Sequence, residues 1–181
     1  PDKARFEDYK GSYEAHFINV PRDAKGIDFA RDCAAMDCIA VALQRSLTYL
    51  SRPADGNRER ERKAAALKFL GHFIADLHQP LHVAHGEDLG GNRIQVKWFG
   101  ADSNLHRVWD SGITEKAGIT WPDSLKVLAE MHPELGSRNV LAWMRESFLL
   151  ARSHAYANVS GQPIIAGDTL DDAYLGRSKP V

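Results

Sequence analysis

Several features are scarce in this sequence of 181 residues. It holds only two cysteines, and its 23 Lys+Arg against 24 Asp+Glu leave a formal net charge of −1. No stretch approaches the roughly 18 consecutive apolar residues that a membrane-spanning helix needs. The near-zero charge excludes a general positive field that would collect nucleic acid or anionic lipid, so any phosphate ligand must be held locally.

The sequence also lacks an initiating methionine, a signal peptide, internal repeats and low-complexity tracts. We therefore expect a processed chain or a piece of a longer one. A chain of 181 residues with 44% hydrophobic content can bury one sizeable core but is short for two. We predict that residues 1–181 form a single domain.

Helical periodicity dominates the pattern of apolar residues, which predicts a mainly α fold. The stretches with helical period are 27–51, 59–85, 104–117, 123–132 and 137–157. The segment NRIQVKWFG (92–100) alternates in the manner of a strand after the Gly90–Gly91 turn, which predicts one short β-hairpin. The tail from 160 to 181 lacks clear periodicity, and we expect no closing element there.

The two cysteines, Cys33 and Cys38, leave two interpretations open. They are either small buried hydrophobes of a protein from a reducing compartment or a disulfide pair. For the second interpretation, Asp37 can cap a helix that begins near Ile39, which places Cys33 in the loop before it. A disulfide would then tie the loop to the helix and indicate an oxidising compartment.

The segment GHFIADLHQPLHVAHGEDLGGN (71–92) carries many side chains that can bind a metal. His72 and Asp76 are four residues apart, so they lie on one helical face, nearly opposite the apolar stripe of Leu70, Ile74, Leu77 and Leu81. A cation between them would avoid a buried unpaired charge.

Pro80 should kink the helix and turn His82 toward the same cavity. Spacing alone does not choose between His82 and His85.

The same spacing recurs in SNLHRVWDSG, where His106 and Asp110 lie four residues apart on a predicted helix that Ser103 could cap. The ligands are nitrogen and oxygen atoms, which suit zinc in an open site that also holds water. Neighbouring cations of this kind neutralise the charge of a phosphoryl transition state. The two pairs therefore predict local phosphate binding by a chain without net positive charge.

These motifs together resemble the zinc-dependent single-strand-specific nucleases of the S1/P1 type, whose fold is shared with zinc-dependent phospholipase C. The resemblance rests on GHFIADLHQPLH, the Gly-Gly-Asn turn, NLHRVWD, the upstream EAHFINVP and the Cys-x-x-x-x-Cys pair. It covers nearly the whole chain. It implies a helical single-domain fold of that superfamily with one short hairpin.

The resemblance also implies a ligand set. One zinc would be bound by His72 and Asp76 together with His16 and Asp2, and Asp76 would bridge to a neighbouring zinc. A separate zinc would take His82, His106 and Asp110. The remaining histidines, His78, His85, His132 and His154, match no ligand position and are interpreted as structural or surface residues.

Three further roles follow from the resemblance. Arg5 would stabilise charge on the phosphate, and Asp76 would share in catalysis through the metals. Phe17 would stack a base, which favours unpaired strands, and Asn92 would contact the substrate. The family's N-terminal segment, which supplies ligands of the third zinc, and its closing helix are absent from this chain, so we expect the third zinc site to be incomplete.

The expected activity is endonucleolytic hydrolysis of single-stranded DNA and RNA to 5′-phosphorylated products, with removal of 3′-phosphates from nucleotides as a further activity. Two alternatives stay open: a zinc-dependent phospholipase C, and an inactive zinc-stabilised binding module. The resemblance favours a secreted or periplasmic monomer with single-stranded nucleic acid or nucleotides as substrate, no membrane insertion and no protein partner.

Overall fold

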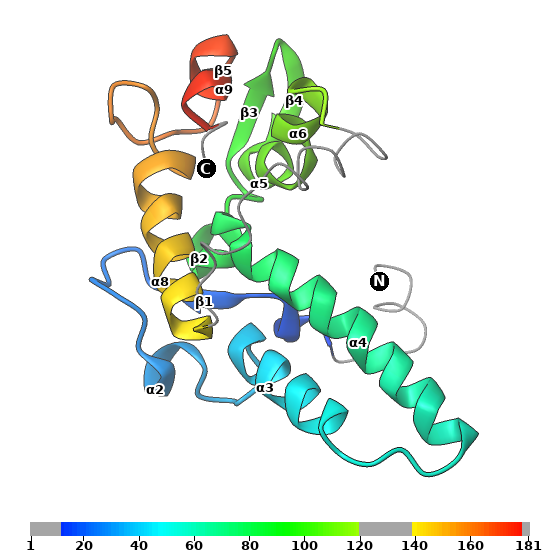
Figure 1. The fold of residues 1–181 in the computed structure, drawn as a ribbon. Helices are drawn as coiled ribbons and strands as arrows, with labels where there is room; N and C mark the ends of the chain where they lie inside the picture. The colour runs from blue at the N-terminus through cyan, green and yellow to red at the C-terminus, as the bar shows by residue number, and fades with distance from the viewer. Residues whose placement is uncertain (1–11, 120–138, 179–181) are drawn as a thin grey trace.

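The structure, a computed structural model, describes residues 12–119 and 139–178 (Figure 1). Helices make up most of the ordered elements and the strands are short, which confirms the mainly α class. No described helix is long and apolar enough to cross a membrane. The expectation of a single domain stays a prediction.

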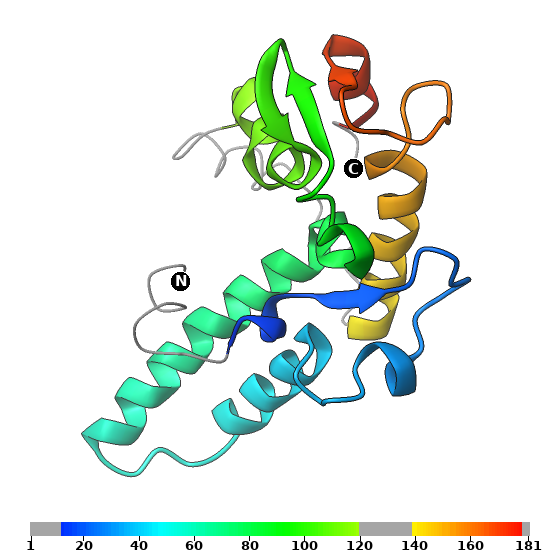
Figure 2. The same ribbon diagram turned by 180° about the vertical axis from the view of Figure 1, so that it is seen from behind.

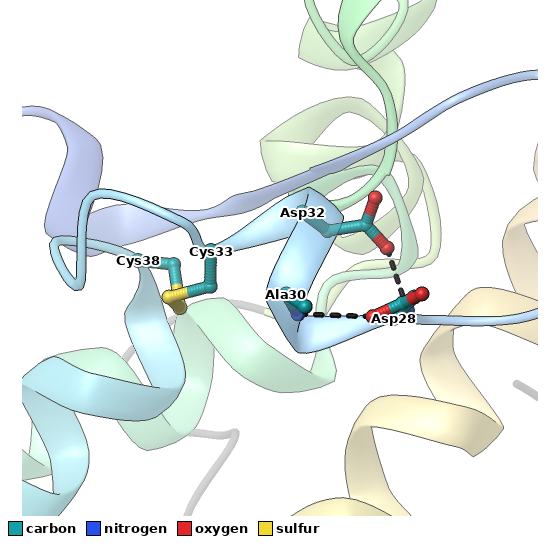
Figure 3. Close-up of a disulfide and its surroundings, with 5 residues drawn as sticks. All are labelled: Asp28, Ala30, Asp32, Cys33 and Cys38. Carbon is teal, nitrogen blue, oxygen red and sulfur yellow. Dashed lines mark hydrogen bonds between the residues drawn. A yellow bond between two sulfur atoms is a disulfide. The ribbon is translucent and has the colours of Figure 1, made fainter.

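Helices α3 (Ile39–Leu50) and α4 (Asn57–His78) follow one another in the sequence and lie side by side (Figures 1 and 2). The sequence predicted one helix over 27–51, but a break at 33–38 separates α3 from the short α2 (Phe29–Asp32). A disulfide between Cys33 and Cys38 closes this break (Figure 3), so the interpretation of the two cysteines as a disulfide pair is confirmed, while the compartment stays a prediction.

The caps of these helices differ in part from expectation. Cys38, with extended backbone, is the N-cap residue of α3 and makes no side-chain cap bond, so the predicted Asp37 cap is wrong. The covalent link of Cys38 to Cys33 fixes the chain where the cap would act. At α2, Asp28 is the cap, since its Oδ1 accepts from the N–H of Ala30 at 2.9 Å (Figure 3).

Pro80 ends α4 rather than kinking it. Gln79, the residue before the proline, has extended backbone (φ −82°, ψ 112°), as steric conflict with the proline ring favours. The chain continues as a 3-10 helix, η2 (Pro80–His82), and then as β2 (Val83–His85). Strand β2 pairs in parallel with β1 (Ile18–Val20). These strands were not predicted because three residues are too few to display alternation.

The second sheet contains the predicted hairpin. Strands β3 (Gln95–Trp98) and β4 (Ala101–Asn104) pair antiparallel, and β5 (Thr169–Leu170) pairs in parallel with β3. Val96 is buried and Ile94 and Trp98 pack against the core, so these alternate residues of the segment face inward. The tail also folds into α9 (Asp172–Ser178). The expectation of no closing element was wrong, because a helix of seven residues is too short for its periodicity to be recognised.

The region predicted helical over 104–117 is a succession of short elements. Helix α5 (Leu105–Arg107) leads into a π-helical turn, η4 (Val108–Gly112), and then α6 (Ile113–Lys116). Ser103 belongs to β4, so Asn104 is the cap instead, and its Oδ1 accepts from the N–H of Arg107 at 2.8 Å. The region predicted over 137–157 is α8 (Val140–Leu150) with the π-helical η6 (Ala151–Ala155). The predicted helix 123–132 lies outside the described residues.

Among the described residues, two hydrophobic clusters form the core, and the segment from the end of α4 into η2 joins them. Leu77 is buried among β1, α3 and α8, whereas Leu81 is buried against the hairpin, η6 and α9. Leu70 and Ile74 pack partly buried beside Leu77, which confirms the predicted apolar stripe. The polar residues between Leu77 and Leu81 therefore lie where the two clusters meet.

Candidate metal centre

The first cluster of possible metal ligands is formed by His16, His72 and Asp76. His16 ends the 3-10 helix η1 (Glu14–His16), directly before β1, and the other two lie one turn apart on α4. Asp76 Oδ2 lies 2.8 Å from His16 Nδ1 and 3.1 Å from His72 Nε2, and the two nitrogens are 3.1 Å apart. All three side chains therefore converge on one point, as the spacing on α4 predicted for two of them.

The second cluster is formed by His82, His106 and Asp110. His82 comes from η2, His106 from α5 and Asp110 from the π-helical turn η4. Asp110 Oδ1 lies 3.5 Å from His82 Nε2, and its Oδ2 lies 3.3 Å from His106 Nε2. The two imidazole rings stack with their centroids 5.0 Å apart.

The two clusters share one pocket of about 910 Å³. Asp76 faces both of them, because its Oδ1 lies 3.7 Å from His82 Nδ1 while its Oδ2 belongs to the first cluster. Helix α4 ends before His82, and the turn into η2 brings that ring to the pocket. His72, Asp76 and His82 therefore border one cavity, as predicted. The reason differs from the prediction, because α4 ends before His82 and is not kinked.

The other residues singled out from the sequence lie in different places. Phe17 and Asn92 line the pocket, whereas Asp2 and Arg5 lie outside the described residues.

His85 points away from the pocket, since its Nδ1 lies 3.4 Å from the carbonyl oxygen of Val20 and its ring packs on Tyr156. Geometry thus selects His82 over His85.

The remaining histidines have other surroundings. His78 has Nδ1 2.7 Å from the carbonyl oxygen of Ile74, and its ring lies near Trp143. His154 has Nδ1 2.8 Å from the hydroxyl of Ser153. Neither lines the pocket, and His132 lies outside the described residues.

Backbone carbonyls hold the two rings of the second cluster. His82 Nδ1 lies 2.9 Å from the carbonyl oxygen of His16, and His106 Nδ1 lies 2.7 Å from that of Gly90. A carbonyl oxygen only accepts, so each Nδ1 carries a proton toward it, which leaves Nε2, the atom that faces Asp110, as the ring nitrogen that a cation would bind in place of a proton.

Gln79 is a polar contact of this centre that sequence reasoning missed. Its side-chain N–H donates to Asp110 Oδ1 at 2.6 Å, and its Oε1 accepts from the N–H of Leu81 at 2.5 Å. Because the amide oxygen is already engaged, the amide nitrogen must face Asp110. The one hint in the sequence was its place between two ligand-bearing segments, because its partner Asp110 lies 31 residues away.

The charges of the second cluster stabilise one another. Burial alone would raise the pKa of Asp110, but hydrogen bonds with His106, His82 and Gln79 outweigh it and hold that pKa far below its usual range. Burial alone would lower the pKa of His106, but the hydrogen bond and charge of Asp110 outweigh it and raise that pKa. Asp110 is therefore an anion at neutral pH and offers charged oxygen atoms to a cation.

The donor atoms fit zinc. A tetrahedral zinc ion with ligands at about 2.0–2.1 Å would separate its ligand atoms by roughly 3.3 Å. The separations within the first cluster are 2.8 to 3.1 Å, and those in the second are 3.3 and 3.5 Å. No Lys or Arg among the described residues lines the pocket, although Glu14, Asp76 and Asp110 do. These clustered carboxylates favour a bound cation.

Comparisons with known proteins match this chain to nucleases. The S1/P1 Nuclease family profile matches residues 1–181. Endonuclease 2 of Arabidopsis thaliana is 31% identical over 207 aligned residues, covering 99% of this chain and 68% of that protein. Endonuclease 3 of the same plant is 32% identical, covering 92% of this chain and 62% of that protein.

Nuclease S1 of Aspergillus oryzae is 38% identical over 105 residues, which cover 56% of this chain and 35% of that protein. The chain thus spans about two thirds of the length of the plant relatives and a smaller share of the fungal one. Because the family profile extends over every residue, the resemblance drawn from the motifs is confirmed: the chain belongs to the S1/P1 nuclease family.

Proposed function

We propose that this protein is a zinc-dependent endonuclease that hydrolyses single-stranded DNA and RNA to 5′-phosphorylated products and also removes 3′-phosphates from nucleotides. The observation that carries the proposal is the placement of two His-His-Asp clusters on one pocket. Membership of a family whose relatives are named nucleases supports the reaction class.

The proposed ligands follow the two clusters. His16, His72 and Asp76 would hold one zinc, and His82, His106 and Asp110 a second. Asp2 would complete the first set, Asp76 would also contribute to a third zinc, and Arg5 would contact the phosphate. Bound divalent cations supply Lewis acidity toward water and phosphoryl oxygens.

The chain's own groups have defined tasks in this proposal. Asp76 and Asp110 supply negative charge that holds the cations, and the carbonyl oxygens of His16 and Gly90 keep the rings of His82 and His106 oriented. The pocket walls bring a phosphodiester against this centre, so positioning and charge neutralisation carry the catalysis. No described side chain needs to act as a nucleophile.

Preference for single strands would come from Phe17 with Asn92 in the same pocket. Phe17 directly follows His16, so a base that stacks on its ring places the adjoining phosphate near the first cluster. Bases in a duplex are already stacked on one another and would have to be unstacked first. The disulfide between Cys33 and Cys38 supports a secreted or periplasmic location.

The test compares end-labelled single-stranded DNA, the same sequence as a duplex, single-stranded RNA and phosphatidylcholine vesicles with the zinc-loaded chain. Cleavage of the single strands with 5′-phosphate ends is the expected result. His72→Ala and Asp76→Ala should remove zinc and activity together, whereas His154→Ala, outside the pocket, should keep both. Turnover of the phospholipid alone would identify a phospholipase C, and zinc binding without any turnover a binding module.

A further inference from the structure

Asp88 is a buried carboxylate that the proposed chemistry does not use. It is 7% exposed and does not line the pocket. The guanidinium of Arg22 donates to its Oδ2. Its Oδ1 accepts from the N–H of Gly91 at 2.7 Å and from the hydroxyl of Tyr156 at 2.8 Å. Asp88 therefore joins three segments that are far apart in the sequence.

The backbone that Asp88 holds is an unusual turn. Leu89, Gly90 and Gly91 all have positive φ, of 55°, 59° and 84°. A left-handed leucine is uncommon, and such conformations persist only where the surroundings fix them. A Cβ on Gly90 would lie 2.5 Å from the carbonyl oxygen of Leu81, so only glycine fits this close approach.

This turn presents the carbonyl that orients a ligand of the second cluster. The carbonyl oxygen of Gly90 accepts from His106 Nδ1 at 2.7 Å. The same peptide unit, Gly90–Gly91, ends in the N–H that Asp88 binds. Because a peptide unit is planar, holding its N–H fixes the direction of its carbonyl as well.

We propose that Asp88 is a positioning residue of the metal centre, which holds the Gly90–Gly91 peptide so that its carbonyl keeps His106 Nε2 turned toward Asp110. The inference rests on the proposed function of the two clusters as metal sites. Arg22 and Tyr156 fix the two oxygens of Asp88, so the carboxylate cannot rotate away from Gly91.

The neighbours of Asp88 are consistent with a fixed carboxylate. Burial raises the pKa of the Tyr156 hydroxyl, and the charge of Asp88 adds to the effect, so Tyr156 remains a hydrogen-bond donor. An asparagine at this position offers one oxygen in place of two. If that oxygen stays with Gly91 and Tyr156, the amide N–H groups face the guanidinium of Arg22, donor against donor, and if it turns to Arg22 the bond to Gly91 is lost.

The test uses Asp88→Asn in the zinc-loaded chain, with two readouts that need no substrate. The first is the exchange rate with water of the His106 Nδ1 proton, measured by NMR, which should rise when the Gly90 carbonyl is released. The second is the zinc affinity of the second cluster, measured by competition with a chelator. It should fall about 10-fold, the lower end of the effect of substitutions around a metal ligand.

Asp168→Asn is the matched control. Asp168 also holds a loop, accepting from the N–H of Ile165 at 2.9 Å, but it lies outside the pocket. It should leave both readouts unchanged. If Asp88→Asn does not fold, Tyr156→Phe removes only the hydroxyl and should shift both readouts in the same direction by a smaller factor.

A folded Asp88→Asn or Tyr156→Phe variant with unchanged proton exchange and unchanged zinc affinity would overturn the inference while leaving the proposed function intact. A loss of thermal stability without either change would mean that Asp88 only stabilises the fold. Failure of the unaltered chain to bind zinc would instead defeat the proposed function, and the inference with it.

Discussion

The Nδ1 atom of His82 lies 2.9 Å from the carbonyl oxygen of His16. The backbone of a residue in the first cluster therefore orients a ring of the second. The parallel pairing of β1 with β2 begins at Ile18 and Val83, just after these two residues, and fixes their segments side by side. Two very short strands thus set the geometry between the clusters.

Each cluster has three side chains of its own. A substitution in one cluster should therefore remove the cation bound there and leave the cation of the other cluster in place. Asp110→Asn is expected to lose the cation of the second cluster and keep that of the first, because it removes the charge that His82 and His106 share. Elemental analysis of zinc per chain is the measurement, with Asp102→Asn on the exposed β4 strand as control. Loss of all zinc from Asp110→Asn would mean that the clusters form one indivisible site.

Removal of metal should destabilise the protein. A ligand present at about 100 times its dissociation constant stabilises the folded state by roughly 2.7 kcal/mol. For a chain of this size that corresponds to a fall in Tm of roughly 5 to 10 °C on chelation. Calorimetry with and without chelator tests this, and re-addition of zinc should restore the original Tm. An identical Tm in both conditions would contradict a metal held by folded ligands.

Much of the site could be predicted because its residues follow local rules. The four-residue spacings of His72 with Asp76 and of His106 with Asp110 survive in the structure, since one turn of helix places such side chains together whatever surrounds them. His16 lies 56 residues before His72, and only the family resemblance placed it there. Gln79 escaped notice because its role depends on Asp110, which packing rather than spacing brings near.

The errors in the fold have a related origin. Asp37 and Ser103 belong to residue types that often cap helices, but Cys38 and Asn104 are the N-cap residues in the structure. Cys38 is tied to Cys33 by the disulfide, and Ser103 is paired with Val96 in the hairpin. The strands β1 and β2 and the helix α9 are each too short for a periodic signal. Their positions come from tertiary contacts, as the burial of Tyr174 and Leu175 in α9 indicates.

Phe17 should govern substrate affinity more than the chemical step. Its ring lines the pocket and meets Tyr13 edge to face, with centroids 5.2 Å apart. Loss of a stacked base costs about 1–3 kcal/mol, roughly 5- to 150-fold in binding. Phe17→Ala is therefore expected to raise KM on single-stranded DNA by that factor with little change in kcat, whereas Phe17→Trp should keep KM low. Equal KM values for all three proteins would rule out stacking on this ring.

The disulfide should stabilise the beginning of α3. A bond that closes such a short loop contributes about 2 kcal/mol by restricting the unfolded chain. The N–H of Ile39, next to Cys38, donates to the carbonyl oxygen of Phe17 at 3.0 Å, so this end of α3 also supports the pocket wall. The double variant Cys33→Ser with Cys38→Ser should lose about 2 kcal/mol in urea unfolding. The unaltered protein treated with reductant should match it, and a fully retained stability would show that the loop needs no link.

His85 should make stability depend on pH below neutrality. Burial lowers its pKa, and the nearby charge of Arg22 adds to that effect, although the carbonyl of Val20 and the charges of Asp88 and Glu87 oppose it. The unfolded chain then takes up a proton near the ordinary pKa of about 6.5, while the folded protein resists it. The unfolded state therefore binds more protons, and stability falls as pH decreases below about 6.5.

His85→Phe keeps the ring packed on Tyr156 but cannot titrate, so its Tm should fall less between pH 7 and pH 5 than that of the unaltered protein. The metal ligands are common to both proteins and cancel in the difference; parallel Tm curves would mean that His85 does not carry the acid sensitivity.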